Sequence, residues 1–254
     1  MTFEIKTERI HANGLNFHVN TCGEGDRLAL CLHGFPEIGY SWRHQLPLLA
    51  SLGYKAWAPD LRGFGQTDKP SGVANYAIEH LVDDVAALID ASGTRETFLL
   101  GHDWGVMLAT QVAFRQVRRL ERLLIFNGVA IGMQHPKRFT LPALKRYLYA
   151  FLFQLPYLPE RLLAAGNFNA LRTTFKGSMC GRPERFTKED IRIFQEAMAR
   201  PGALTEGINY CRAQIGRGGI RRITARGFPV IEAPTMIILD EDNPVLVPST
   251  IDRA

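Results

Sequence analysis

Hydrophobic and polar residues alternate over the first part of the chain, and short continuous apolar runs follow. The alternation covers residues 3–22 and is interrupted by a turn signal at Asn13-Gly14, which predicts an antiparallel hairpin at one side of a sheet. Short apolar runs are typical of parallel strands buried on both faces. We expect such strands, separated by helical stretches near residues 42–52 and 78–88, at residues 28–32, 55–58 and 97–100.

Two further apolar runs, at residues 123–126 and 235–239, are separated by a long stretch with helical periodicity and many aromatic residues. The pattern predicts an α/β fold with a mostly parallel sheet flanked by helices. Residues 1–128 and 229–254 would form the core, and residues 129–228 an inserted helical cap. Ligand sites of parallel sheets lie beyond the carboxyl ends of the strands, so we expect the cap to cover the site there.

The pentapeptide Gly101-His102-Asp103-Trp104-Gly105 lies between the predicted strand at 97–100 and a helix-like stretch. A sharp strand-to-helix turn presents its central side chain above the sheet edge, which makes Asp103 a candidate nucleophile. A carboxylate that attacks a saturated carbon forms an ester, and water can cleave that ester at its carbonyl. Attack on an ordinary ester or amide would require an anhydride. The expected substrate is therefore an alkylating electrophile.

Composition narrows the protein class. The chain has 254 residues, is 46% hydrophobic, and has room for one α/β domain with an insert. Its charged first residues do not resemble a signal peptide and no run is long enough to span a membrane, so we expect a cytoplasmic protein. The four cysteines lack metal-site or disulfide spacing. The net charge of +5 comes with arginine clusters that lack interleaved aromatic residues, which argues against nucleic-acid binding.

Several motifs in this order resemble those of the α/β-hydrolase-fold epoxide hydrolases. They are the elbow at 101–105 and three earlier segments, namely His33-Gly34-Phe35-Pro36-Glu37, Tyr40-Ser41-Trp42-Arg43 and Asp60-Leu61-Arg62-Gly63-Phe64-Gly65. The resemblance implies an oxyanion hole formed by the backbone N–H groups of Phe35 and Trp104, with a cis Phe35-Pro36 peptide. It also implies that both residues contact substrate, that the partners are a small apolar epoxide and water, and that no metal or organic cofactor is needed. A homodimer is compatible with it.

Epoxide opening also needs an acid for the leaving oxygen, and relatives in this family use cap tyrosines. By resemblance, Tyr149 occupies the first tyrosine position. The second tyrosine usually precedes an arginine, but this chain reads Asn209-Tyr210-Cys211-Arg212, with cysteine at the expected place. Tyr210 is an expected substrate contact, although adjacent helical residues point in different directions. One phenol would then serve alone, with slower ring opening.

Two further departures concern the end of the chain. The family places an acid before a proline to orient the catalytic histidine, and this chain reads Asp240-Glu241-Asp242-Asn243-Pro244. Asp242 and Asn243 remain alternative candidates for that role. The chain stops at Ala254, before the strand and helix that would complete the core and the loop that would carry the histidine. Truncation, a partner that supplies this segment, and a natural pseudoenzyme are the alternatives, and truncation is favoured.

Three functions remain open. The first is an epoxide hydrolase that forms a vicinal diol through an Asp103 alkyl ester, although without the histidine the ester would persist. The second is a haloalkane dehalogenase, a weaker match because its second halide donor is commonly an asparagine where Phe35 stands. Fluoroacetate dehalogenases match less well because they place arginine after the nucleophile. The third is a non-catalytic ligand-binding protein.

Overall fold

The computed structural model describes residues 3–128, 148–176, 183–216, 218–225 and 227–239. In these residues the sheet has seven strands in the order β1-β2-β4-β3-β5-β6-β7. The hairpin strands pair antiparallel, β2 pairs antiparallel with β4, and the remaining pairs are parallel. The strands are β1 (Lys6–Ala12), β2 (Leu15–Cys22), β3 (Arg27–Leu32), β4 (Tyr54–Pro59), β5 (Glu96–His102), β6 (Arg122–Phe126) and β7 (Thr235–Ile238).

The expected hairpin is confirmed. Asn13 and Gly14 form its turn with φ values of 45° and 71°, which suit a tight two-residue connection between twisted strands. The expected α/β fold with a mostly parallel sheet is confirmed as well.

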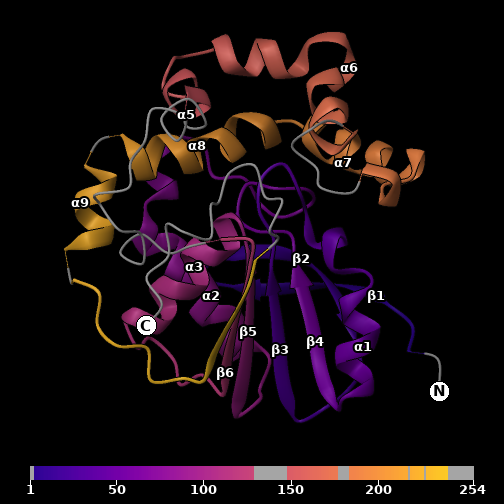
Figure 1. Ribbon diagram of the computed structural model, residues 1–254, viewed down its shortest axis with the longest axis vertical. Helices are drawn as coiled ribbons and strands as arrows, with labels where there is room; N and C mark the ends of the chain where they lie inside the picture. The colour runs from indigo at the N-terminus through magenta and orange to yellow at the C-terminus, as the bar shows by residue number, and fades with distance from the viewer. Residues whose placement is uncertain (1–2, 129–147, 177–182, 217, 226, 240–254) are drawn as a thin grey trace.

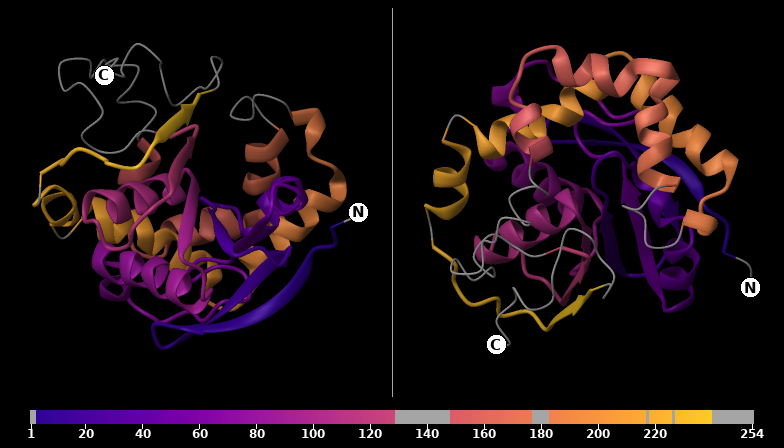
Figure 2. Two further views of the ribbon diagram at one scale, coloured as in Figure 1. Left: turned by 90° about the horizontal axis from the view of Figure 1, so that it is seen from below. Right: turned by 45° about the horizontal axis from the view of Figure 1, so that its top comes forward.

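Helices cover both faces of the sheet (Figures 1 and 2). On one face lies α1 (Gln45–Ser51), preceded by the 3-10 helix η1 (Gly39–Trp42), and on the other lie α2 (Ile78–Ala91) and α3 (Trp104–Phe114). The period-2 alternation of β5 places Leu99 in the core beneath α2 and α3 and Leu100 in the core beneath α1. This two-sided burial explains why the parallel strands are continuously apolar.

Further helices lie between β6 and β7 in the sequence and arch over one end of the sheet (Figure 1). We call residues 148–224 the helical insert. Its elements are α5 (Leu148–Leu152), α6 (Leu158–Lys176), η4 (Pro183–Arg185), α7 (Lys188–Ala199), α8 (Ala203–Ile215) and α9 (Gly219–Thr224). The helix α6 contains a break, because residues 165–168 depart from helical backbone angles.

The insert shares its hydrophobic core with the rest of the molecule. Phe194 of α7 and Tyr210 of α8 are fully buried and belong to the same cluster as Leu30 and Val106. Residues of the 3-10 helix η2 (Val73–Tyr76) pack against α8. The division into a core and a cap at residues 128 and 229 stays a prediction, and the described contacts join the two parts closely.

Candidate active site

Asp103 lies at the turn between β5 and α3, with φ 51° and ψ −114°. A positive φ is strained for a residue with a Cβ, and such strain is held only where the surroundings fix it. Gly105 permits the tight turn, because a Cβ at this position would lie 2.1 Å from the carbonyl oxygen of Leu32 in β3. The sequence therefore folds into a sharp elbow that lifts Asp103 above the sheet edge.

Two backbone N–H groups converge on the Asp103 carboxylate. The N–H of Phe35 donates to Oδ1 of Asp103 at 2.9 Å, and the N–H of Trp104 also donates to this carboxylate. Phe35-Pro36 is a cis peptide, as expected. Asp103 retains accessible surface, but the protein around it disfavours the charged form and raises its pKa, while nearby His102 and the two N–H groups oppose the rise. The residues predicted to be nucleophile and oxyanion donors are thus brought together.

His102 and Glu37 form an ion pair beside Asp103. Nδ1 of His102 lies 3.0 Å from Oε2 of Glu37. Burial opposes the charge on His102, but the Glu37 carboxylate outweighs it and raises the pKa of His102 to about 9. Burial likewise opposes the charge on Glu37, yet His102 lowers the pKa of Glu37 to about 2. The elbow therefore carries a positive imidazolium next to Asp103 near neutral pH.

The sequence interpretation missed this pair. It treated His102 and Glu37 only as members of two separate motifs. The available signal was that both motifs follow adjacent parallel strands at the same sheet edge and that each contains ionisable residues.

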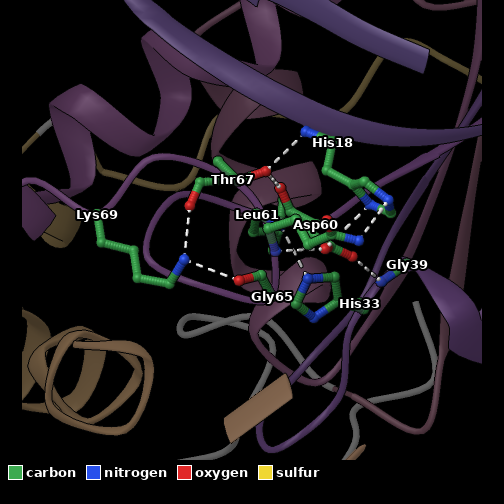
Figure 3. A network of polar contacts seen from close by, with 9 residues as sticks. His18, His33, Gly39, Asp60, Leu61, Gly65, Thr67 and Lys69 are labelled. Atoms are coloured by element: carbon green, nitrogen blue, oxygen red, sulfur yellow. Dashed lines mark hydrogen bonds and ion pairs between the residues drawn. The ribbon is translucent and has the colours of Figure 1, made fainter. Parts of the chain in front are cut away.

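A polar network fixes the loop that carries Phe35 (Figure 3). His33 accepts the N–H of Leu61 on Nε2 at 2.9 Å, so its Nδ1 carries the proton that is shared with the carbonyl of Gly34 at 2.8 Å. Burial lowers the pKa of His33, which keeps the ring neutral. Asp60 accepts the N–H groups of Gly39 and Gln66 at 3.0 and 2.9 Å. These contacts tie the loop after β3 to the loop after β4.

The helical insert supplies an apolar cluster next to the elbow. Phe35 and Trp104 pack against buried residues of α5, the turn after it and α8, which are Ala150, Phe153, Leu204, Ile208 and Cys211. The Asp103 carboxylate is thus adjacent to residues that pack against an apolar surface of the insert. Such surroundings favour an apolar ligand and limit its hydration.

Tyr149, the expected first acid, lies on α5 near this cluster. Its ring contacts the ring of Phe153, with centroids 5.6 Å apart, and Phe153 in turn contacts the ring of Phe35 at 5.8 Å. Its side chain is 43% exposed. Two ring contacts therefore connect the candidate acid to the residue that binds Asp103.

Tyr210 and Cys211 are buried on α8. The hydroxyl of Tyr210 donates to the carbonyl oxygen of Arg62 at 2.9 Å, and its ring lies 5.9 Å from that of Trp104. Its polar end is thus used in a protein contact, and its ring supports Trp104. The Cys211 thiol lies 3.7 Å from the carbonyl oxygen of Ala150, and burial raises its pKa to about 11. Neither contact favours these residues as proton donors.

Asp242 and Asn243 lie outside the described residues, as does everything expected of the chain after residue 239. Within the described ranges, acidic, histidine and cysteine side chains form no group of three or more that could hold a metal ion. Among the described helices, none combines the length and apolar character that a membrane crossing requires.

Comparisons with known proteins agree with this architecture. The family model described as "alpha/beta hydrolase fold" matches residues 30–253. The chain is 36% identical to the AB hydrolase superfamily protein YfhM of Bacillus subtilis, over 82% of this chain and 73% of that protein. It is also 36% identical to Epoxide hydrolase 2 of Siraitia grosvenorii, over 85% of this chain and 70% of the relative.

A second group of relatives is longer, and a solved structure is similar. Epoxide hydrolase 4 of Mus musculus is 36% identical over 92% of this chain, which spans 65% of the mouse protein. The crystal structure of epoxide hydrolase VrEH1 from Vigna radiata is similar with a TM-score of 0.82 and 30% identity, over 97% of this chain and 83% of that chain.

Proposed function

Because this chain belongs to the α/β-hydrolase-fold family of epoxide hydrolases, we propose that it opens a small apolar epoxide by forming an alkyl ester on Asp103. The observation that carries the proposal is the convergence of the Phe35 and Trp104 N–H groups on the carboxylate of an elbow aspartate.

The first step is nucleophilic substitution. One carboxylate oxygen of Asp103 forms a bond to an epoxide carbon, the C–O bond of the ring breaks, and the released oxygen takes a proton from the Tyr149 hydroxyl. The apolar cluster beside Phe35 and Trp104 would hold the hydrocarbon part of the substrate. With cysteine at position 211, this assignment relies on Tyr149.

The second step is ester hydrolysis. Water adds to the ester carbonyl carbon of Asp103, and the negative charge that develops on the carbonyl oxygen is stabilised by the N–H groups of Phe35 and Trp104. The ester C–O bond then breaks, the departing oxygen takes one proton of the water to complete the vicinal diol, and the other proton returns to the Tyr149 phenolate as Asp103 regains its carboxylate. We assign the orientation of a water-activating histidine to Asp242 or Asn243, as the family resemblance implies. His102 is paired with Glu37 and His33 is held neutral by two contacts, so neither is our candidate for that base.

Intact-protein mass spectrometry with styrene oxide tests both steps. Formation of styrene glycol without a lasting mass increase indicates complete turnover, whereas a persistent increase by one styrene oxide indicates alkylation without hydrolysis. Peptide mapping should place the ester on Asp103, and Asp103→Asn should form neither adduct nor diol. Asp83→Asn, an exposed aspartate on α2, is the matched control. Diol formation by Asp103→Asn at the wild-type rate would contradict the proposal.

The same assay addresses the alternatives. Release of bromide from 1-bromobutane at a rate above diol formation from styrene oxide would favour a haloalkane dehalogenase. Reversible binding of styrene oxide with neither adduct nor diol would favour a non-catalytic ligand-binding protein.

A further inference from the structure

Arg212 connects α8 to the turn between α5 and α6 through its whole guanidinium group. Nε donates to the carbonyl oxygen of Phe153 at 2.8 Å, and Nη2 donates to that of Leu155 at 2.7 Å. Nη1 and Nη2 also bind both carboxylate oxygens of Glu160, at 2.7 and 3.2 Å. A fifth contact joins Nη1 to Asn209 at 3.3 Å. The five N–H donors of the side chain thus have five contacts.

The two carbonyl groups belong to the turn after α5. Phe153 directly follows the last helical residue, Leu152, and Leu155 lies two residues further along the chain, so neither carbonyl accepts a bond within α5. The Arg212 side chain is only 12% exposed and that of Glu160 is 17% exposed, so water screens their interaction less than it screens a surface ion pair. The guanidinium group is planar and its N–H groups point in fixed directions. It therefore defines the orientation of this turn better than the flexible ammonium group of a lysine would.

Phe153 links this fixed turn to the reacting groups. Its N–H donates to the carbonyl oxygen of Tyr149 at 2.8 Å, and its ring contacts the rings of Tyr149 and Phe35. Phe35 in turn donates to Asp103. A displacement of the Phe153 peptide would therefore move the backbone that presents Tyr149 and loosen the packing against Phe35.

We infer that Arg212 is a positioning residue that sets the place of Tyr149 relative to Asp103 through the backbone of Phe153. The inference rests on the proposed function, in which Tyr149 gives a proton to the opening epoxide. Cysteine at position 211 strengthens the dependence, because the adjacent helical position then offers a buried thiol of raised pKa instead of a second phenol. Arg212 itself does not contact substrate in this assignment.

Single-turnover alkylation by styrene oxide tests the inference. Arg212→Lys keeps the positive charge but loses the guanidinium donors. We expect the alkylation rate at saturating substrate to fall about tenfold, since acid catalysis depends on the exact placement of the Tyr149 hydroxyl. The styrene oxide concentration that gives half the maximal rate should change less than about threefold, because the apolar binding surface stays in place. Arg192→Lys is the matched control: it replaces an exposed arginine of α7 that pairs with Glu189 and Glu196, and it should retain the wild-type rate.

A double-variant cycle separates positioning from a general structural effect. If Arg212 acts through the Tyr149 hydroxyl, Arg212→Lys should slow Tyr149→Phe less than about twofold further, because the group to be positioned is gone. Rate losses that multiply in the double variant would overturn the inference. If circular dichroism shows that Arg212→Lys does not fold, Glu160→Gln replaces it in the cycle. This variant keeps Arg212, so it should give a smaller loss of alkylation rate, which should likewise not add to that of Tyr149→Phe.

A spectroscopic readout keeps this inference distinguishable from the proposed function. With 3-fluorotyrosine at position 149, the ¹⁹F chemical shift should change in Arg212→Lys and stay unchanged in Arg192→Lys, whether or not the protein reacts with an epoxide. Absence of adduct and diol together with the expected fluorine shift would defeat the function but retain the positioning. Normal alkylation with an unchanged fluorine shift in Arg212→Lys would defeat the positioning.

Discussion

The backbone N–H of Phe35 lies 2.9 Å from Oδ1 of Asp103, although the residues are 68 positions apart in the chain. Their proximity follows from the sheet: β3 and β5 are adjacent and parallel, and Leu32 is the register partner of Gly101. Both strands end at the same edge, so the loops that follow them meet there. The sheet therefore builds the donor and the carboxylate into one site.

Gly105→Ala should destabilise the protein where α3 lies against the end of β3. The new Cβ would lie 2.1 Å from the carbonyl oxygen of Leu32, which is backbone and has little room to move. We expect a loss of about 3 kcal/mol or more in the free energy of unfolding, as for severe overpacking. Urea denaturation followed by circular dichroism measures it.

Gly14→Ala separates crowding from backbone strain. Gly14, unlike Gly105, has a positive φ of 71°, but no atom lies within 4 Å of its would-be Cβ, so its replacement should cost only about 1 kcal/mol. Equal losses for Gly105→Ala and Gly14→Ala would argue against the crowding explanation.

The sequence predicted the elements that depend on local periodicity and turn chemistry. The hairpin at Asn13-Gly14, the strands and the elbow at Asp103 have short-range signals, and each is present in the structure. The pairing of Glu37 with His102 and the contact between Tyr210 and Arg62 depend on how distant segments meet, which periodicity does not report. The substrate contact of Tyr210 stays a prediction, while the donation of its hydroxyl to the carbonyl oxygen of Arg62 was not foreseen.

Glu37→Gln should return the pKa of His102 from about 9 toward its ordinary value of 6.5, because the carboxylate that stabilises the imidazolium is lost. Titration of the His102 ring by NMR measures the change. Glu24→Gln changes an exposed residue and should leave the pKa of His102 unaltered. A His102 pKa that stays near 9 in Glu37→Gln would mean that Glu37 does not cause the shift.

The same pair gives stability a defined pH window. The folded-state pKa of His102 is raised, so its contribution is complete below about 6.5 and is lost as pH rises through about 9. The pKa of Glu37 is lowered from 4.5 to about 2, so its contribution is complete above 4.5 and is lost as pH falls toward 2. The stability difference between wild type and Glu37→Gln, from urea denaturation, should be greatest between pH 4.5 and 6.5.

His102→Gln should shift the acidic side of the pH profile of the alkylation rate to higher pH. Burial raises the pKa of Asp103, and the His102 charge counteracts that rise. Without the charge, the pKa of Asp103 should rise further, so a higher pH is needed to obtain the reactive carboxylate. The alkylation rate with styrene oxide, measured against pH, tests this expectation. An acidic side of the profile at the wild-type position, or one shifted to lower pH, would contradict it.

Asp190→Asn should weaken the attachment of α7 to the core. Asp190 accepts from the Tyr40 hydroxyl at 2.9 Å and pairs with Arg43 at 2.9 Å, while it also caps α7 through Thr187. Loss of the charge in this buried cluster should cost about 1–3 kcal/mol in the free energy of unfolding. Hydrogen exchange should accelerate in α7 and remain unchanged in α2. Uniform acceleration in both helices would indicate global destabilisation instead.

Tyr149→Phe and Tyr210→Phe should distinguish a proton donor from a tyrosine whose hydroxyl has only a structural role. If the Tyr149 hydroxyl protonates the leaving oxygen, its removal should slow styrene oxide alkylation by roughly 10²-fold or more, the usual range of general acid catalysis. Tyr210→Phe loses only the hydrogen bond to the Arg62 carbonyl, so it should cost about 1 kcal/mol of stability and little alkylation rate. The reverse pattern, with Tyr149→Phe near the wild-type rate, would transfer the acid role to Tyr210 and require its buried hydroxyl to leave Arg62 during the reaction.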